Sequence, residues 1–242
     1  MPSPASGIPH SMAELIVALD VPSPADVAPV LAALDGPVQF YKIGLELYCA
    51  GGADVVRAVT AQGRRVFLDL KFHDIPRTVE RAVRSAALPG VELMTLHAGG
   101  GRAMIAAAAA AARSCPPDRR PRLLAVTVLT SLDQDDLTEL GVPRAMDDHV
   151  LALARMAIAA GADGVVCSPR EVARLRAELP PRTLLVTPGV RPSGADMGDQ
   201  RRTATPGEAV RAGATHLVVG RPILSAADPA AAAAAILRDM SA

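Results

Sequence analysis

The chain has 242 residues, half of them hydrophobic, and its 25 acidic and 25 basic residues give a formal net charge of zero. This length and apolar content predict a large buried core, in one barrel-sized domain or in two smaller ones. The even mixture of charges argues against a surface that binds nucleic acid or membranes, and the sequence contains no apolar run long enough to span a bilayer.

The N-terminal segment and the cysteines indicate the cellular compartment in which the protein is expected. Residues 1–11 are rich in Pro, Ser and Gly and lack the basic and apolar regions of a signal peptide, so we expect a disordered tail ahead of a single domain at residues 12–242. Cys49, Cys115 and Cys167 are far apart and odd in number, which predicts free thiols rather than a disulfide framework or a metal site. A cytoplasmic protein is therefore expected.

Short apolar runs alternate along the chain with stretches of helical periodicity. The expected strands cover residues 15–19, 38–42, 66–71, 91–97, 123–129, 164–167, 183–187 and 216–220. The helices expected after them end near residue 34 and then cover residues 52–61, 75–87, 102–113, 149–160, 170–178, 206–212 and 229–238. Eight such alternations predict an α/β fold, the (β/α)8 TIM barrel, and an open doubly wound sheet is the alternative.

Two long connections interrupt this alternation. Residues 131–148 and 189–205 are longer than the other links between a strand and its helix. We expect them to be active-site loops rather than domain boundaries, because function concentrates on such loops.

The strand expected at residues 66–71 ends in an unusual set of charges. Side chains alternate along a strand, so Asp69 and Lys71 should share one face. Asp74 follows on the turn, since Pro76 prevents simple continuation of the strand. This stretch therefore predicts a cluster of two carboxylates around one ammonium.

Lysine is rare in this chain. Of the 25 basic residues only Lys42 and Lys71 are lysines, and both stand at the ends of apolar runs. An ammonium is compact and can give up a proton, whereas a guanidinium effectively cannot. The pattern favours a chemical role such as proton donation over the alternative that two lysines remain by chance on a solvated surface.

The active site of a (β/α)8 barrel lies at the C-terminal ends of its strands. Asp20, Lys42 and the Asp69/Lys71 pair end three consecutive strands, so their side chains should form one array of alternating charge. Any one of them is as easily explained as a cap or a surface ion pair, but the four together favour a site. The histidines show no metal-ligand spacing, so we expect no metal.

A phosphate site is expected beside this array. The stretches that begin at Pro188 and Gly220 each bring glycine, backbone N–H groups and an arginine, Arg191 or Arg221, to the strands where barrels commonly bind phosphate.

At these residues the sequence closely resembles the bacterial type of the orotidine 5′-monophosphate decarboxylase family, from Leu15 to the last helix. The stretches that carry the resemblance are ALD at 18–20, YKIG at 41–44, FLDLKFHDIP at 67–76, VTVLTS at 126–131, TPGVRP at 187–192, GDQRR at 198–202 and VVGRPI at 218–223. The combination is specific, although the Asp-x-Lys-x-x-Asp motif alone is shared with related barrel enzymes.

The resemblance implies decarboxylation of orotidine 5′-monophosphate to uridine 5′-monophosphate in de novo pyrimidine biosynthesis, without metal or organic cofactor. It implies that Lys71 protonates C6 of the pyrimidine and that Asp69 lies against the departing carboxylate. Lys42 and Asp74 would complete the catalytic array.

The resemblance also implies a homodimer with shared active sites, in which Asp74, Ile75 and Thr78 serve the neighbouring subunit. Asp20 would bind the ribose, Thr130 and Ser131 would face the base, and the later loops would bind or enclose the phosphate. The substrate-binding residues that it implies are Asp20, Lys42, Asp69, Asp74, Ile75, Thr78, Thr130, Ser131, Pro188, Arg191, Gln200, Gly220 and Arg221.

Two departures from the family pattern and two other functions are relevant. Arg77 stands where the family usually has Asn, and Thr203-Ala204 replaces an apolar-Met pair, which affects the ribose side and the phosphate loop. One alternative is a sugar-phosphate enzyme that uses the same motif with magnesium, such as a keto-gulonate phosphate decarboxylase or a hexulose-phosphate synthase. Lys42 disfavours it, because those relatives have a carboxylate there. The other is a catalytically silent barrel that binds a nucleotide or phosphate.

Overall fold

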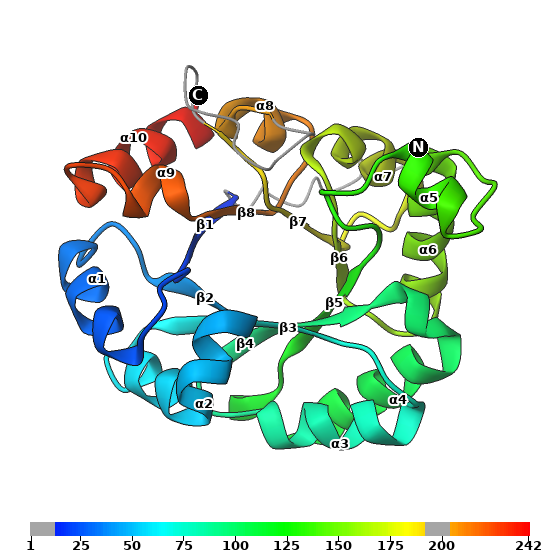
Figure 1. Cartoon of the computed structure of the whole chain (residues 1–242), viewed down its shortest axis with the longest axis horizontal. Coiled ribbons are helices and arrows are strands. Elements are labelled where there is room, and N and C mark those ends of the chain that lie inside the picture. The colour runs from blue at the N-terminus through cyan, green and yellow to red at the C-terminus, as the bar shows by residue number, and fades with distance from the viewer. Residues whose placement is uncertain (1–12, 192–203) are drawn as a thin grey trace, which may run out of the picture.

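Eight parallel strands close into a barrel with helices arranged around it (Figure 1). The computed structural model of the protein describes residues 13–191 and 204–242, so the expected tail at residues 1–11 lies outside it. The strands are β1 (Glu14–Ala18), β2 (Phe40–Gly44), β3 (Arg65–Phe72), β4 (Val91–His97), β5 (Arg122–Val126), β6 (Gly164–Val166), β7 (Leu184–Thr187) and β8 (His216–Val219). Each strand pairs with the next, and β8 pairs with β1. The (β/α)8 prediction is confirmed, and the open sheet is excluded.

The helices follow the strands in the expected alternation. They are α1 (Val27–Ala33), α2 (Leu45–Thr60), α3 (Pro76–Ala86), α4 (Gly101–Ser114), α5 (Gln134–Glu139), α6 (Met146–Ala159), α7 (Val172–Glu178), α8 (Pro206–Arg211), α9 (Arg221–Leu224) and α10 (Pro229–Met240).

Three of these helices differ from the prediction, which did not include the short helix α9. The helix expected at residues 52–61 begins at Leu45, and Gly52 (φ 59°, ψ −148°) forms a kink inside it rather than its first residue. The connection at residues 131–148 contains α5, which begins with a capping box in which the Asp133 side chain accepts the backbone N–H of Asp136. Part of the predicted loop is therefore helical.

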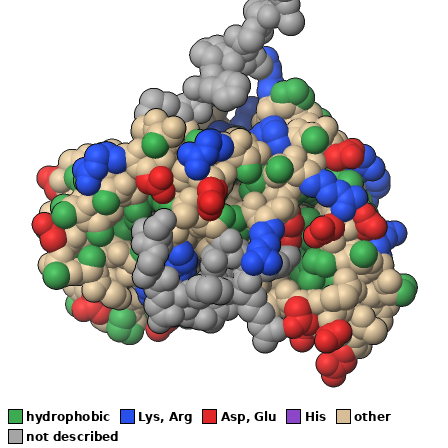
Figure 2. All heavy atoms as spheres, turned by 90° about the horizontal axis from the view of Figure 1, so that it is seen from above, with side chains coloured by type: hydrophobic (Ala, Val, Ile, Leu, Met, Phe, Trp, Pro, Cys, Tyr) green, Lys and Arg blue, Asp and Glu red, His purple; other side chains and the backbone are tan. Residues whose placement is uncertain are grey.

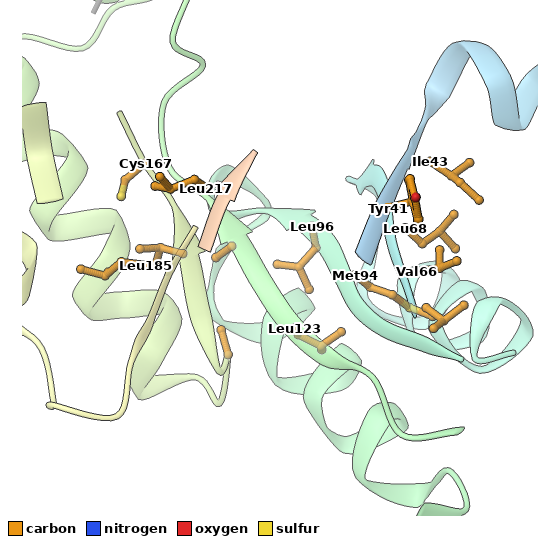
Figure 3. Packing of buried hydrophobic residues seen from close by; sticks show 14 of the residues in the cluster. Tyr41, Ile43, Val66, Leu68, Met94, Leu96, Leu123, Cys167, Leu185 and Leu217 are labelled. Carbon is orange, nitrogen blue, oxygen red and sulfur yellow. The ribbon is translucent and has the colours of Figure 1, made fainter. Parts of the chain in front are cut away.

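Strand side chains alternate between the barrel interior and the layer beneath the helices. The interior is filled by a small cluster of buried residues: Ile16, Ala18, Phe40, Phe67, Leu93, Leu124, Val186 and Val218. Leu68, Met94 and Leu96 belong to the larger outer layer (Figure 3). Because side chains alternate with a period of two, the residues two positions after Ala18, Phe40 and Phe67 also face the barrel axis. These are polar residues at the C-terminal ends of the strands.

The surface agrees with the balanced composition. Acidic and basic side chains are interspersed over the face shown in Figure 2. Within the described residues, no helix has the length and apolar character needed to cross a membrane. The three cysteines are free thiols, as predicted.

Candidate active site

Four charged side chains meet at the C-terminal ends of β1, β2 and β3. Lys42 Nζ lies 3.1 Å from Asp20 Oδ1 and 3.8 Å from Asp69 Oδ2. Lys71 Nζ donates a hydrogen bond of 2.9 Å to the same Asp69 oxygen. The predicted proximity of these side chains is confirmed, and they form the sequence Asp20, Lys42, Asp69, Lys71 in which the sign of the charge alternates.

Exposure differs along this charged array. The side chains of Lys42 and Asp69 are each 12% exposed, whereas those of Lys71 and Asp20 are 29% and 51% exposed. A nearly buried ammonium and carboxylate are stable only when paired, and each has a partner of opposite sign on either side. The nearly buried pair Lys42 and Asp69 therefore holds Asp20 and Lys71 by ion pairs, and solvent or a ligand can reach these two outer side chains.

The charged array lines a cavity of about 140 Å³. Gly44 borders the cavity, and a Cβ at this position would lie 2.8 Å from Lys42 Nζ. A Cβ at Gly220, just after β8, would lie 2.9 Å from Asp20 Oδ2. Both glycines thus leave space for the charged side chains. The cavity is lined by Leu19, Asp20, Lys42, Gly44, Leu45, Glu46, Leu47, Asp69 and Lys71.

A larger hollow lies elsewhere. It measures about 450 Å³ and is lined only by side chains of α3: Pro76, Arg77, Glu80, Arg81 and Arg84. We place the candidate active site in the smaller cavity, because that is where several strand ends bring acidic and basic groups together.

The predicted residues of the β3–α3 turn and of the first turn of α3 do not join the charged array of their own chain. None of Asp74, Ile75 and Thr78 lines the cavity. Asp74 is exposed, its Oδ1 accepts the backbone N–H of Ile75 at 2.6 Å, and no basic side chain among the described residues forms an ion pair with it. Ile75 is 66% exposed although it is apolar.

The residues expected at the base and phosphate lie on the same end of the barrel. Thr130 and Ser131 follow β5, and Gly220 precedes the first residue of α9, Arg221. Pro188 follows β7, and beyond it Arg191 donates its backbone N–H to Ala204 O at 3.0 Å. Gln200 lies outside the described residues. Of this group, Gly220 lies beside the charged array, because a Cβ at this position would lie 2.9 Å from Asp20 Oδ2.

Two histidines lie beside Lys71. The ring centroids of His73 and His97 are 5.4 Å apart. Burial lowers the pKa of His97, and the charges of His73 and Lys71 lower it further. Within residues 13–191 and 204–242, no three His, Cys, Asp or Glu side chains are grouped so that they could hold a metal ion.

Sequence reasoning missed Thr95 and the residues that line the cavity from α2. Thr95 is fully buried on β4, and its hydroxyl donates to Asp69 Oδ1 at 2.9 Å. A polar residue within the apolar run at residues 91–97 was a signal that could have found it. Leu45 and Glu46 were missed because the helix was expected to begin at Gly52 rather than at Leu45.

Comparison with known proteins gives the family. The model of the "Orotidine 5'-phosphate decarboxylase / HUMPS family" matches residues 13–236. The chain belongs to this family. The family description names both orotidine 5'-phosphate decarboxylase and HUMPS, so the residues of the site have to distinguish between these two kinds of protein.

Individual relatives agree over nearly the whole chain. Orotidine 5'-phosphate decarboxylase of Opitutus terrae is 52% identical over 94% of this chain and 98% of its own length. The Anaeromyxobacter sp. (strain K) enzyme of the same name is 54% identical over 92% and 96%. Among solved structures, that of orotidine 5'-phosphate decarboxylase from Lactobacillus acidophilus has a TM-score of 0.86 at 41% identity and covers 95% of this chain and 100% of its own.

Proposed function

We propose that this protein decarboxylates orotidine 5′-monophosphate to uridine 5′-monophosphate, a step of de novo pyrimidine biosynthesis, without metal or organic cofactor. The curated relatives that bear the name of this activity match almost the whole chain. The observation that carries the proposal is Lys42, whose Nζ lies between Asp20 and Asp69 at 3.1 and 3.8 Å. An ammonium in this position pairs with the two carboxylates that a divalent cation would otherwise need.

Lys71 is the proposed proton donor. When the bond between C6 and the carboxylate breaks, carbon dioxide leaves and the electron pair stays on C6. An ammonium close to C6 stabilises that charge and then transfers a proton, which forms the C6–H bond and leaves a neutral amine to be reprotonated from solvent. The hydrogen bond of 2.9 Å to Asp69 holds Lys71 Nζ on the wall of the cavity.

Asp69 and Lys42 are proposed to set the electrostatics around that proton transfer. Asp69 would face the departing carboxylate while it aligns Lys71, and Lys42 would neutralise part of the negative charge. Because these groups are already paired in the fold, little reorganisation is needed when charge develops on C6.

Substrate binding is assigned to the groups around the cavity. Asp20, the most exposed member of the charged array, would accept hydrogen bonds from ribose hydroxyls. Thr130 and Ser131 would face the base. Phosphate would bind near the start of α9, where backbone N–H groups and an arginine fork suit an anion. The residues proposed for phosphate are Pro188, Arg191, Gln200, Gly220 and Arg221.

We propose that the active form is a homodimer with shared sites and that Asp74 completes the charged array of the partner. Asp74 has no basic partner among the described residues of its own chain, and Ile75 next to it exposes apolar surface that an interface would bury. Thr78 lies close by, in the first turn of α3. We also propose that residues 12–242 act as one cytoplasmic catalytic domain, preceded by a tail at residues 1–11.

Subunit mixing tests the shared site. Lys71→Ala and Asp74→Ala homodimers should each be inactive, and after subunit exchange the mixture should recover activity, because half of the sites in a heterodimer would carry both native residues. Exchange without recovery of activity would contradict the shared site.

The reaction itself is tested by the absorbance change of orotidine 5′-monophosphate in the presence of a chelator. Wild type should turn the substrate over and Lys71→Ala should not, with both proteins folded. Turnover that requires added magnesium, or activity only on sugar phosphates, would favour the other branch of the family. Binding without any turnover would favour a silent nucleotide-binding barrel.

A further inference from the structure

The pairing of β3 with β4 is irregular at the charged array. Leu68 pairs with Met94 and Phe72 with Leu96, so the residues from Asp69 to Lys71 face the single residue Thr95. This bulge inserts extra residues into β3 and interrupts the ladder of backbone hydrogen bonds. Lys71 takes a left-handed conformation there, with φ 50°, the one positive φ of a non-glycine residue within the described residues.

The Thr95 side chain replaces the missing backbone partner. Its Oγ1 accepts the backbone N–H of Lys71 at 2.9 Å and donates its proton to Asp69 Oδ1 at 2.9 Å. A hydroxyl has one proton, so the direction of both bonds is fixed once the Lys71 N–H is the donor. Thr95 is fully buried, so bulk solvent does not reach its side chain.

We propose that Thr95 is a positioning residue for proton transfer, an inference that rests on the proposed function. Its hydroxyl fixes one oxygen of Asp69 and leaves Oδ2 to the lysines, which lie 2.9 and 3.8 Å from that oxygen. The same hydroxyl holds the backbone of Lys71 in its left-handed conformation. Thr95 thereby fixes the orientation of the Asp69 carboxylate and the position of the Lys71 backbone from which the side chain extends. It does this although it does not line the cavity.

The substitution that tests this is Thr95→Val, which keeps the shape of the side chain and removes the hydroxyl. Without it, Lys71 N–H and Asp69 Oδ1 lose their shared partner, and the ammonium is no longer held in place. We expect kcat to fall about 100-fold, as displacement of a reacting group by about 1 Å can do, and KM to stay within about threefold because the substrate contacts remain. Thr95→Ser, which keeps the hydroxyl, should retain kcat within about threefold of wild type.

Thr215 provides a matched control at the other end of the barrel. Its Oγ1 accepts the backbone N–H of Leu185 at 3.0 Å and donates to Leu185 O at 3.1 Å, so it also links one strand, β7, to the neighbouring chain segment, just before β8. Thr215→Val should lower the melting temperature and leave kcat and KM unchanged. If kcat fell equally in Thr95→Val and Thr215→Val, the loss would come from weaker contact between strands, and the positioning role of Thr95 would be overturned.

A second pair covers the case in which Thr95→Val does not fold. Thr95→Ser and Thr95→Cys have side chains of similar size, but a thiol is a poor hydrogen-bonding group. The serine variant should be about tenfold faster than the cysteine variant if the hydroxyl positions Lys71. A folded Thr95→Val with the kcat of wild type, or equal kcat in the serine and cysteine variants, would overturn the inference and leave the decarboxylase assignment intact. Wild type without turnover of orotidine 5′-monophosphate would overturn the proposed function and the inference together.

Discussion

The two ends of the barrel both contain alternating charges, but the charges are used differently. At the N-terminal end, Arg65 forms ion pairs with Glu14 and Glu92, and its guanidinium lies 4.5 Å from the centre of the Phe40 ring. At the C-terminal end, Lys42 and Lys71 alternate with carboxylates around a cavity.

The choice of cation explains this difference. A planar guanidinium donates to two carboxylates and stacks on an aromatic ring, so Arg65 closes the N-terminal end as a packed network. An ammonium is compact and can lose its proton, which suits a group that must act on a ligand. We therefore expect substitutions at the N-terminal end to change stability and substitutions at the C-terminal end to change catalysis.

Removal of one carboxylate from each end should show the largest contrast. Asp69→Asn removes the negative charge between Lys42 and Lys71 and leaves one acceptor oxygen where Lys71 and Thr95 each use one. We expect kcat/KM for orotidine 5′-monophosphate to fall about 10³-fold. Glu14→Gln removes a carboxylate from the N-terminal network, and it should leave kcat/KM unchanged while lowering the free energy of unfolding by about 1 kcal/mol. Steady-state kinetics and urea unfolding of both variants check this. Equal catalytic losses would contradict the division between the two ends.

The N-terminal end should also make stability depend on pH. His216 is 4% exposed, and burial is the main reason why its pKa is lowered to about 4. The negative charge of Glu14 raises this pKa, whereas the positive charges of Arg122 and Arg65 lower it. The unfolded chain binds the proton more readily, so this stabilisation is complete above about pH 6.5 and is lost as the pH falls toward about 4.

We expect the free energy of unfolding to fall by about 2 kcal/mol between about pH 7 and pH 5 because of this histidine. The variant His216→Leu should remove that part of the slope, as measured by urea unfolding at several pH values. An unchanged slope would show that the ring titrates as it does in the unfolded chain.

A smaller effect is expected from Gly44→Ala at the C-terminal end. Its backbone, at φ −93° and ψ −175°, accepts alanine without strain, but the new Cβ would lie 2.8 Å from Lys42 Nζ. The ammonium should move, so kcat/KM should fall about tenfold, while the free energy of unfolding should fall by about 1 kcal/mol at most, because Gly44 is the N-cap of α2 and alanine is a poorer N-cap than glycine. Kinetics and thermal unfolding measure both quantities, and unchanged kcat/KM would mean that Lys42 can shift without consequence.

The sequence predicts those parts of the protein that local pattern and barrel geometry determine. Apolar runs locate all eight strands, and parallel pairing requires that Asp20, Lys42 and Asp69 meet at one end. The role proposed for Thr95 could not be predicted, because it depends on a bulge in which several residues of β3 face one residue of β4. The start of α2 was missed because the helix was expected to begin at Gly52, whereas it begins at Leu45 and accommodates Gly52 as a kink.

The most direct test of the account compares two exchanges of lysine and arginine, one at each end of the barrel. Lys71→Arg keeps the positive charge beside Asp69 but removes a cation that can give up a proton. Arg65→Lys makes the reverse exchange in the N-terminal network. We predict that Lys71→Arg lowers kcat by about 10⁴-fold and that Arg65→Lys keeps kcat within about twofold while losing about 1 kcal/mol of stability. A Lys71→Arg enzyme with kcat within about tenfold of wild type would contradict the account, because a fixed positive charge would then be sufficient.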